Sequence, residues 1–252
     1  AVYAVISGGH SNDASGASTF VGGGENNIAS GILAVIAGGS SNTASSDYAS
    51  IGGGVRNTAS GTSSTVGGGN TNTSSGQRAF VGSGQGNLAS GNDATVGGGG
   101  SNTASSNNAT IGGGRFNTAS NNDATVGGGF TNTASGVYSV ISAGHSNDAS
   151  GSSSAVGGGE NNIASGIDNI ASGLYAVVSG GESNIAQGDH SFAAGKNAQA
   201  WDNGSFVWSD ASGGNFGSSL ADEFNIRANG GYRLYSNTAL SAGVTMANGA
   251  SA

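Results

Sequence analysis

The chain has 252 residues, a net charge of −8 and 51 glycines, with no proline and no cysteine. Collagen is excluded because glycine does not recur at every third position, and simple disorder is disfavoured because only 8% of the residues are charged. Six Lys and Arg residues cannot neutralise a run of phosphates, so we expect no nucleic-acid partner, and no apolar run in this segment is long enough to span a membrane.

Repeats of fifteen residues fill the chain over 2–166. The units "ASTFVGGGENNIASG" (17–31) and "NDATVGGGFTNTASG" (122–136) show the pattern. Seven residues, "IDNIASG" (167–173), then interrupt it before one further unit at 174–188, which brings the number of full units to twelve. Repetition at a fixed period predicts a solenoid in which each unit forms one coil.

Each unit contains two predicted strands. Its fifth position is always Val or Ile, and the residues before it follow a period of two, which predicts a short strand with one buried face. The "NTA" or "NIA" segment predicts the second strand, and the glycines allow the turns between the two. Two strands and two turns suit one coil of a parallel β-solenoid, with coils about 4.8 Å apart.

The Val and Ile residues at the fifth position are the candidate core. So thin a coil is expected to leave this row half exposed, and burying it returns little free energy against the entropy of ordering a coil. We therefore predict a homo-oligomer in which several chains bury their rows against one another. The residues predicted to form this core are Ile6, Val21, Ile36, Ile51, Val66, Val81, Val96, Ile111, Val126, Ile141, Val156 and Val178.

The eleventh position of every unit is asparagine. Asparagine is a common turn residue, and its amide group can hydrogen-bond to its neighbours in a stack. We interpret these residues as a structural ladder of stacked amides and not as ligands. They are Asn12, Asn27, Asn42, Asn57, Asn72, Asn87, Asn102, Asn117, Asn132, Asn147, Asn162 and Asn184.

The stretch "SFAAGKNAQAWDNGSFVWSD" (191–210) contains Ser191-Phe192-Ala193-Ala194-Gly195, followed by the spaced alanines of Ala198-Gln199-Ala200. In this it resembles the YadA-like head repeat of trimeric autotransporter adhesins, and the resemblance covers roughly residues 1–207. It implies a homotrimer in which each chain winds a left-handed parallel β-roll with its aliphatic residues turned inward. The usual family period is shorter than fifteen, so the coil shape is expected to differ.

Aromatic and charged residues become frequent near the C-terminus. "FVWSD" followed by "FNIRANGGYRLYSN" is similar to the segment that precedes the intramolecular chaperone of phage tail fibres, and it implies a β-rich neck that caps the open end of the solenoid. We therefore divide the chain into a head-repeat solenoid (1–188, with a partial coil at 167–173), a last coil and transition (189–208), and a neck-like β segment (209–252).

No catalytic residue, metal ligand or cofactor is predicted. His10 and His145 occupy the same position in two near-identical units, but too few other ligands converge on either to indicate a metal site. The glycine runs lack the Asp of calcium-binding repeats and the Lys of phosphate-binding loops. The carboxylates within 202–223 are interpreted as solvated turn residues, so we predict that the chain is not an enzyme.

The variable ninth and tenth positions follow the glycines and are predicted to lie on the outer turn. Isolated exposed aromatic and Arg residues favour interfaces, so Arg115, Phe116 and Phe130 are the candidate partner contacts.

These features predict the head of a homotrimeric extracellular fibre, an adhesin on the cell surface that binds a host, matrix or cell-surface ligand through many weak contacts. The alternative is a receptor-binding tail-fibre segment of a phage or contractile injection system.

Residues 1–6 already belong to a repeat, so no signal peptide is expected and we interpret the chain as a piece of a longer protein. An ice-binding solenoid is a remote alternative, suggested by a column at the twelfth position that contains Thr43, Thr58, Thr73, Thr103, Thr118 and Thr133.

Overall fold

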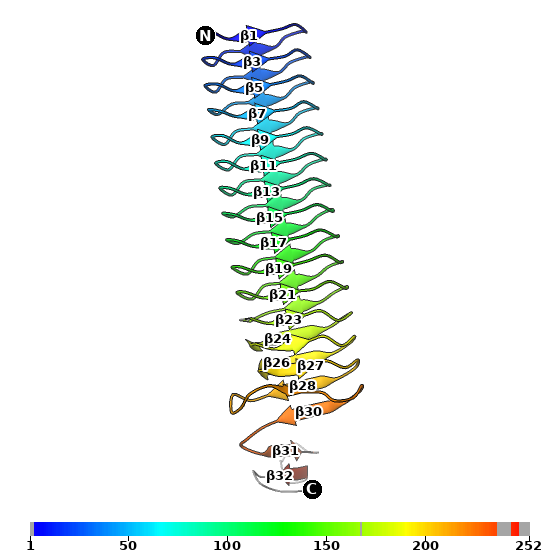
Figure 1. Cartoon of the computed structure of the whole chain (residues 1–252). Coiled ribbons are helices and arrows are strands. Elements are labelled where there is room, and N and C mark those ends of the chain that lie inside the picture. The colour runs from blue at the N-terminus through cyan, green and yellow to red at the C-terminus, as the bar shows by residue number, and fades with distance from the viewer. Residues whose placement is uncertain (1–2, 167, 236–242, 247–252) are drawn as a thin grey trace.

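The computed structural model of the protein describes residues 3–166, 168–235 and 243–246. Most of those residues form a straight stack of coils, and every regular element among the described residues is a strand (Figure 1). Each coil adds one strand to each of two parallel sheets of fifteen strands, and a separate two-stranded sheet follows them. The prediction of an all-β parallel solenoid is therefore confirmed.

The first sheet contains the odd-numbered strands in chain order. They are β1 (Val5–Ile6), β3 (Phe20–Val21), β5 (Val35–Ile36), β7 (Ser50–Ile51), β9 (Thr65–Val66), β11 (Phe80–Val81), β13 (Thr95–Val96), β15 (Thr110–Ile111), β17 (Thr125–Val126), β19 (Val140–Ile141), β21 (Ala155–Val156), β23 (Ile170–Ala171), β25 (Ile185–Ala186), β27 (Ala198–Ala200) and β29 (Phe216–Gly217).

The second sheet contains the even-numbered strands. They are β2 (Asp13–Ala14), β4 (Ile28–Ala29), β6 (Thr43–Ala44), β8 (Thr58–Ala59), β10 (Thr73–Ser74), β12 (Leu88–Ala89), β14 (Thr103–Ala104), β16 (Thr118–Ala119), β18 (Thr133–Ala134), β20 (Asp148–Ala149), β22 (Ile163–Ala164), β24 (Val177–Glu182), β26 (Phe192–Lys196), β28 (Phe206–Ser209) and β30 (Phe224–Arg227). The last two strands, β31 (Tyr232–Tyr235) and β32 (Gly243–Met246), form an antiparallel pair.

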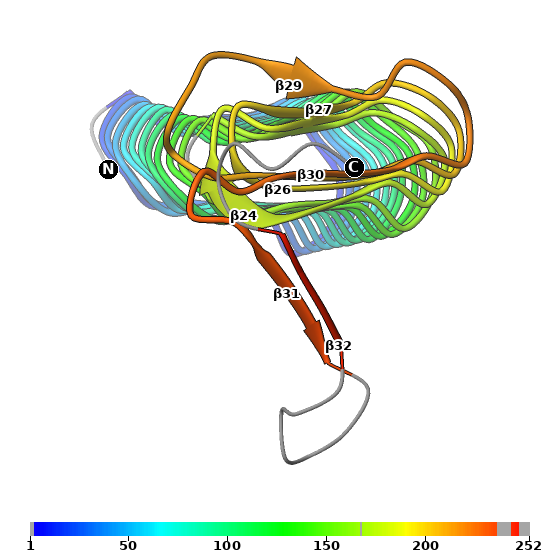
Figure 2. The same cartoon turned by 90° about the horizontal axis from the view of Figure 1, so that it is seen from below.

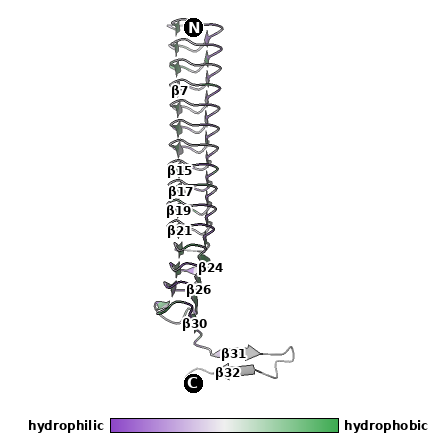
Figure 3. Cartoon of the chain, turned by 90° about the vertical axis from the view of Figure 1, so that its right-hand side faces the viewer, coloured by the Kyte–Doolittle hydropathy of each residue, from purple (hydrophilic) through white to green (hydrophobic). Residues whose placement is uncertain are grey.

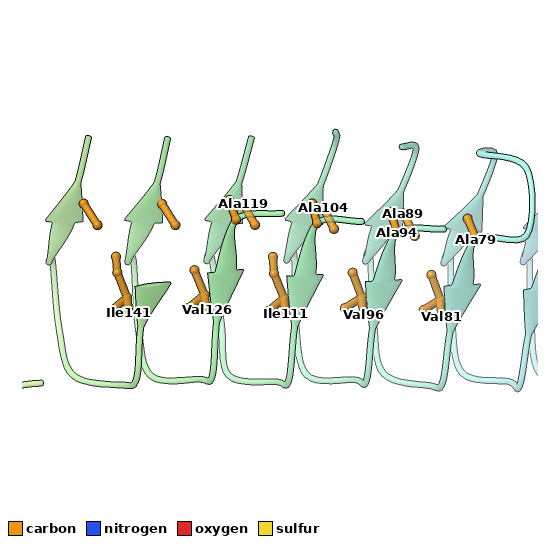
Figure 4. Packing of buried hydrophobic residues seen from close by; sticks show 14 of the residues in the cluster. Ala79, Val81, Ala89, Ala94, Val96, Ala104, Ile111, Ala119, Val126 and Ile141 are labelled. Carbon is orange, nitrogen blue, oxygen red and sulfur yellow. The ribbon is translucent and has the colours of Figure 1, made fainter. Parts of the chain in front are cut away.

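The core is a thin layer between the two sheets. Side chains from Val81 to Ile141 lie in one row and face a row of alanines that includes Ala89, Ala104 and Ala119 (Figure 4). In each coil one branched aliphatic side chain packs against the small alanines of the same chain, so little space remains between the sheets.

The expectation that the fifth-position row is half exposed in a lone chain is wrong. Eleven of the twelve side chains, from Val21 to Val178, are at most 1% exposed within one chain, and only Ile6 in the first described coil is open, at 45%. The row points into the coil, where the opposite sheet and the small Ala, Ser or Thr residues before each strand enclose it. These eleven side chains therefore have no free surface to share with another chain, and the homotrimer stays a prediction that needs outward-facing residues.

The third glycine of each triplet permits the close stacking of the coils. Gly114 has a positive φ of 86°, and a Cβ atom there would lie 2.1 Å from the carbonyl oxygen of Gly129 in the next coil. The preceding Gly113 has open space where a Cβ would stand. A side chain at Gly114 would therefore clash with the backbone of the next coil, whereas Gly113 has room for one.

The seven-residue interruption is half a coil, and it exchanges the two sheets. Before it, the fifth-position residue Val156 lies in the first sheet. After it, the fifth-position residue Val178 lies in the second sheet, where it pairs with Ala164, while Ala171 pairs with Val156 in the first. Both sheets run through this exchange without a break.

The solenoid extends beyond the boundary expected at residue 208. Strands β29 and β30 continue both sheets as far as Arg227. The rings of Phe192, Phe206 and Phe224 stack along the second sheet with 4.8 Å between successive centroids. The pair β31–β32 then leaves the stack sideways (Figures 2 and 3). The rest of the predicted neck, 236–242 and 247–252, lies outside the described residues.

Candidate binding surface

The asparagine side chains form a buried hydrogen-bonded ladder. The Nδ2 atom of Asn102 donates to the carbonyl oxygens of Gly98 and Gly114, both at 2.9 Å, and its Oδ1 atom accepts the backbone N–H of Asn117 at 3.0 Å. The same bonding recurs from coil to coil, and Asn102 is fully buried. Its amide group is fully used by the chain itself, which leaves no polar atom for a ligand.

The half coil splits this ladder into two. The Oδ1 atom of Asn162, the last member on the first side, accepts the backbone N–H of Ala176 at 2.7 Å. A second ladder then begins at Asn169, whose Oδ1 atom accepts the N–H of Asn184 at 2.9 Å. Asn184 in turn accepts the N–H of Ala198 at 2.9 Å. Asn169 was not predicted from the sequence because it lies inside the interruption and not at a numbered repeat position.

The three predicted partner contacts lie next to one another on the outer turns of adjacent coils. Ninth-position residues from His10 to Glu160 form a continuous line of parallel bridges along this edge. The Arg115 guanidinium lies 5.3 Å from the centre of the Phe116 ring, and the Phe116 and Phe130 rings meet edge to face at 5.7 Å. Both rings are exposed, at 46% and 42%.

The line of side chains continues through three further coils. The His145 ring lies 5.3 Å from that of Phe130, and its Nδ1 atom is 3.2 Å from Oε1 of Glu160. The hydroxyl of Tyr175 donates to Oε2 of Glu160 at 3.2 Å, and the His190 ring stacks on Tyr175 at 5.2 Å. The edge strip is defined by the residues Phe116, Phe130, His145, Glu160, Tyr175 and His190.

Tyr175 and His190 belong to the strip because of the half coil. Both occupy the second position of a repeat, which in earlier coils lies on the opposite edge, as at Tyr138. After the exchange of sheets, the backbone N–H of Tyr175 donates to the carbonyl of Glu160 at 3.1 Å. These two residues were not predicted from the sequence, although the length of the interruption, close to half of fifteen, was the available signal.

A hollow of about 590 Å³ adjoins the Arg115 end of the strip, and the residues that line it are Thr71, Gln85, Gly86, Gly99, Gly100, Ser101 and Arg115. It exists because two consecutive outer turns carry glycine, Gly86 and Gly100, where other coils have side chains. The guanidinium of Arg115 has no ion-pair or hydrogen-bond partner within the described ranges. The Arg115 guanidinium therefore provides an unpaired positive charge in the hollow, next to the polar groups of the backbone.

The histidines and the C-terminal carboxylates take part in local contacts. Among the described residues, no three His, Cys, Asp or Glu side chains meet closely enough to hold a metal ion. Hydrogen bonds from the backbone N–H of Ser219, from Asn225 and from the Ser219 hydroxyl lower the pKa of Glu223 to about 2. The pKa of Asp210 is lowered too, chiefly by the backbone N–H of Asn229. Both carboxylates accept hydrogen bonds from backbone N–H groups of turns near the last coil.

No protein-family model matches this chain, and no curated protein is detectably similar to it in sequence. Within the described part of the chain there is no helix of the length and hydropathy that a bilayer crossing needs. The fold and the surface together define the class of the molecule as a parallel β-solenoid repeat protein.

Proposed function

We propose that this chain is the rod-like head of a homotrimeric extracellular fibre that attaches a cell to a host, matrix or cell surface. The observation that carries the proposal is the straight stack of coils, in which an outer turn recurs at regular intervals along the rod (Figure 1). Repeated display on a rod converts weak single contacts into firm attachment. The YadA-like phrase at 191–210 also supports it.

The trimer contact proposed here uses outward-facing side chains. In the first three coils Val5, Phe20 and Val35 are register neighbours on the outer face of the first sheet, and they are 48%, 40% and 36% exposed. An exposed apolar column of this kind is typical of a surface that another chain covers. Three chains would then meet along sheet faces, and each would keep its own core.

The experiment is a measurement of mass in solution by light scattering during size-exclusion chromatography. We expect three times the chain mass of 23.8 kDa. Beads coated with the protein should then adhere to cells or matrix, whereas beads coated with heat-unfolded protein should not. The mass of a single compact chain in solution, together with coated beads that do not adhere, would contradict the proposal.

A tail-fibre segment of a phage or injection machine is the second candidate. It is favoured by the hairpin β31–β32, which leaves the solenoid within the segment that resembles tail-fibre sequences. The neighbouring sequence of the full-length protein separates the two: a downstream membrane anchor supports the adhesin, and an upstream baseplate-attachment domain supports the tail fibre.

Ice binding has weaker support. Outward-facing threonines form one column on each sheet, such as Thr103 and Thr118 on the second and Thr95 and Thr110 on the first. The two columns lie on different sheets and therefore do not combine into one flat array, and Phe80 and Leu88 interrupt them. A thermal-hysteresis measurement tests this alternative directly.

For the proposed non-enzymatic role, a glycosidase screen should show no turnover.

A further inference from the structure

We propose that the edge strip and the adjoining hollow bind a linear glycan in which carboxylated sugars alternate with neutral ones, lying parallel to the solenoid axis. The inference rests on the proposed function, because it names the ligand class of the same attaching rod. Four observations carry it: the width of the strip, its exposed rings, the free guanidinium at one end and the half coil that lengthens it.

The shape of the strip fits a linear polymer. It places one ring or carboxylate per coil in single file, and adjacent coils are about 4.8 Å apart, a rise comparable with the length of one sugar in an extended chain. A globular protein partner would need a contact of about 1,200 Å² or more in total, which a file one residue wide does not offer. A thin chain can follow it from coil to coil.

The chemistry of the strip fits sugars. Phe116 and Phe130 expose 46% and 42% of their surface, and the electron-rich faces of such rings attract the C–H groups on the apolar face of a pyranose. His145 and Glu160, whose side chains are 49% and 40% exposed, provide hydrogen-bonding atoms for hydroxyl groups. Alternation of apolar faces and polar groups is the pattern that a sugar chain itself presents.

The charge distribution selects a sparsely acidic glycan. Arg115 is the guanidinium beside the hollow, and a planar guanidinium binds a carboxylate through two parallel hydrogen bonds. The strip also contains the carboxylate of Glu160, and the whole chain has a net charge of −8, which disfavours a dense polyanion such as a nucleic acid. At one sugar per coil, an alternating glycan with a carboxylate beside Arg115 places a neutral sugar beside Glu160, three coils further on, which matches this arrangement.

The experiment is isothermal titration of the full chain with a hyaluronan decasaccharide, with a neutral dextran of similar length as the reference. We expect heat of binding for hyaluronan and none for dextran. Phe130→Ser should weaken binding about tenfold, the size of effect that loss of one central contact residue produces. Phe80→Ser is the matched control, since Phe80 is 41% exposed but lies on the face of the first sheet, and it should change the affinity less than about twofold.

Two further variants test the Arg115 end. Arg115→Gln should weaken binding about tenfold, whereas Arg56→Gln, on the outer turn of an earlier coil, should leave it unchanged. Gly100→Gln fills the hollow, and the fold tolerates it because a Cβ at Gly100 meets only the Arg115 side chain, at 3.5 Å, and the preceding coil already carries Gln85 there. This variant should also lose binding while keeping its circular dichroism spectrum.

Deletion of residues 167–173 tests the length of the strip. It restores an unbroken fifteen-residue period, so the solenoid is preserved, and it returns Tyr175 and His190 to the opposite edge. We expect weaker binding of the decasaccharide and unchanged binding of a tetrasaccharide, which spans only the Arg115 end. An equal loss of affinity for the decasaccharide and the tetrasaccharide would overturn the assignment of Tyr175 and His190 to the binding site.

Other outcomes identify other occupants and overturn the inference. Strip variants that bind hyaluronan like their controls exclude a glycan site, and strip variants that change the mass in solution make the strip a contact between chains. Binding of a single-stranded oligonucleotide in preference to hyaluronan would identify a different polymer. A trimer that adheres to cells without binding hyaluronan contradicts only this inference, whereas a non-adherent single chain contradicts the proposed function.

Discussion

At the level of single residues, the repeated asparagine connects one coil to the next. Its side chain is fully buried, and it bonds to backbone groups of its own coil and of the next one. A core of one Val or Ile per coil provides little hydrophobic stabilisation, and these hydrogen bonds add to it. Sequence repetition predicted this ladder because a stack of identical coils places identical residues above one another.

Asn102→Ala should lower the free energy of unfolding by about 2–4 kcal/mol, because the N–H of Asn117 loses its acceptor in a buried position. Urea unfolding followed by circular dichroism measures the loss. Asn107→Ala is the control, since Asn107 lies on an exposed turn, and it should change stability by less than about 0.5 kcal/mol. Equal effects of the two variants would mean that the ladder contributes nothing.

At the level of elements, the strands of the first eleven repeats are only two residues long and depend on their neighbours in the stack. The half coil shows what this permits: "IDNIASG" adds one strand, moves the repeat to the other sheet and leaves both sheets continuous. The interruption is visible in the sequence but the exchange of sheets is not, because the exchange follows from which strand pairs with which and not from any local preference.

The last coil contains a carboxylate whose charged form is favoured by its hydrogen bonds. The pKa of Glu223 is lowered from 4.5 to about 2 by hydrogen bonds from Ser219 and Asn225. A lowered pKa in the folded state contributes stability at pH values above 4.5, and this contribution is lost as the pH falls from 4.5 to about 2.

We therefore expect Glu223→Gln to show a smaller loss of thermal stability between pH 4.5 and pH 2 than the unsubstituted protein, measured by circular dichroism. Glu25→Gln, on an outer turn near the other end of the rod, serves as the control. An unchanged pH dependence in Glu223→Gln would contradict the role of this carboxylate.

At the level of the whole molecule, the core and the surface that is free to assemble are separate. Val96 and Ile111 point into the coil and are fully buried, whereas Thr95 and Thr110 of the same strands point outward. Folding of a coil and association of chains therefore depend on different side chains, and substitutions can separate the two processes.

Val96→Asp combined with Ile111→Asp should unfold the surrounding coils even in a single chain, because each buried carboxylate costs several kcal/mol. Thr95→Asp combined with Thr110→Asp should keep the β-sheet spectrum. Circular dichroism at low concentration and light scattering distinguish the two pairs. A folded Val96/Ile111 double variant would contradict the enclosed core seen here.

The sequence by itself determined the period, the two strands per coil, the all-β parallel solenoid and the asparagine ladder. These follow from local alternation and from repetition, which a single chain expresses at every unit. Only the tertiary structure decided that the aliphatic row is enclosed within one chain, that half a coil exchanges the sheets, and that Tyr175 and His190 join Phe130 on one edge. Each of these depends on which segments lie side by side after winding, and that is a property of long-range register.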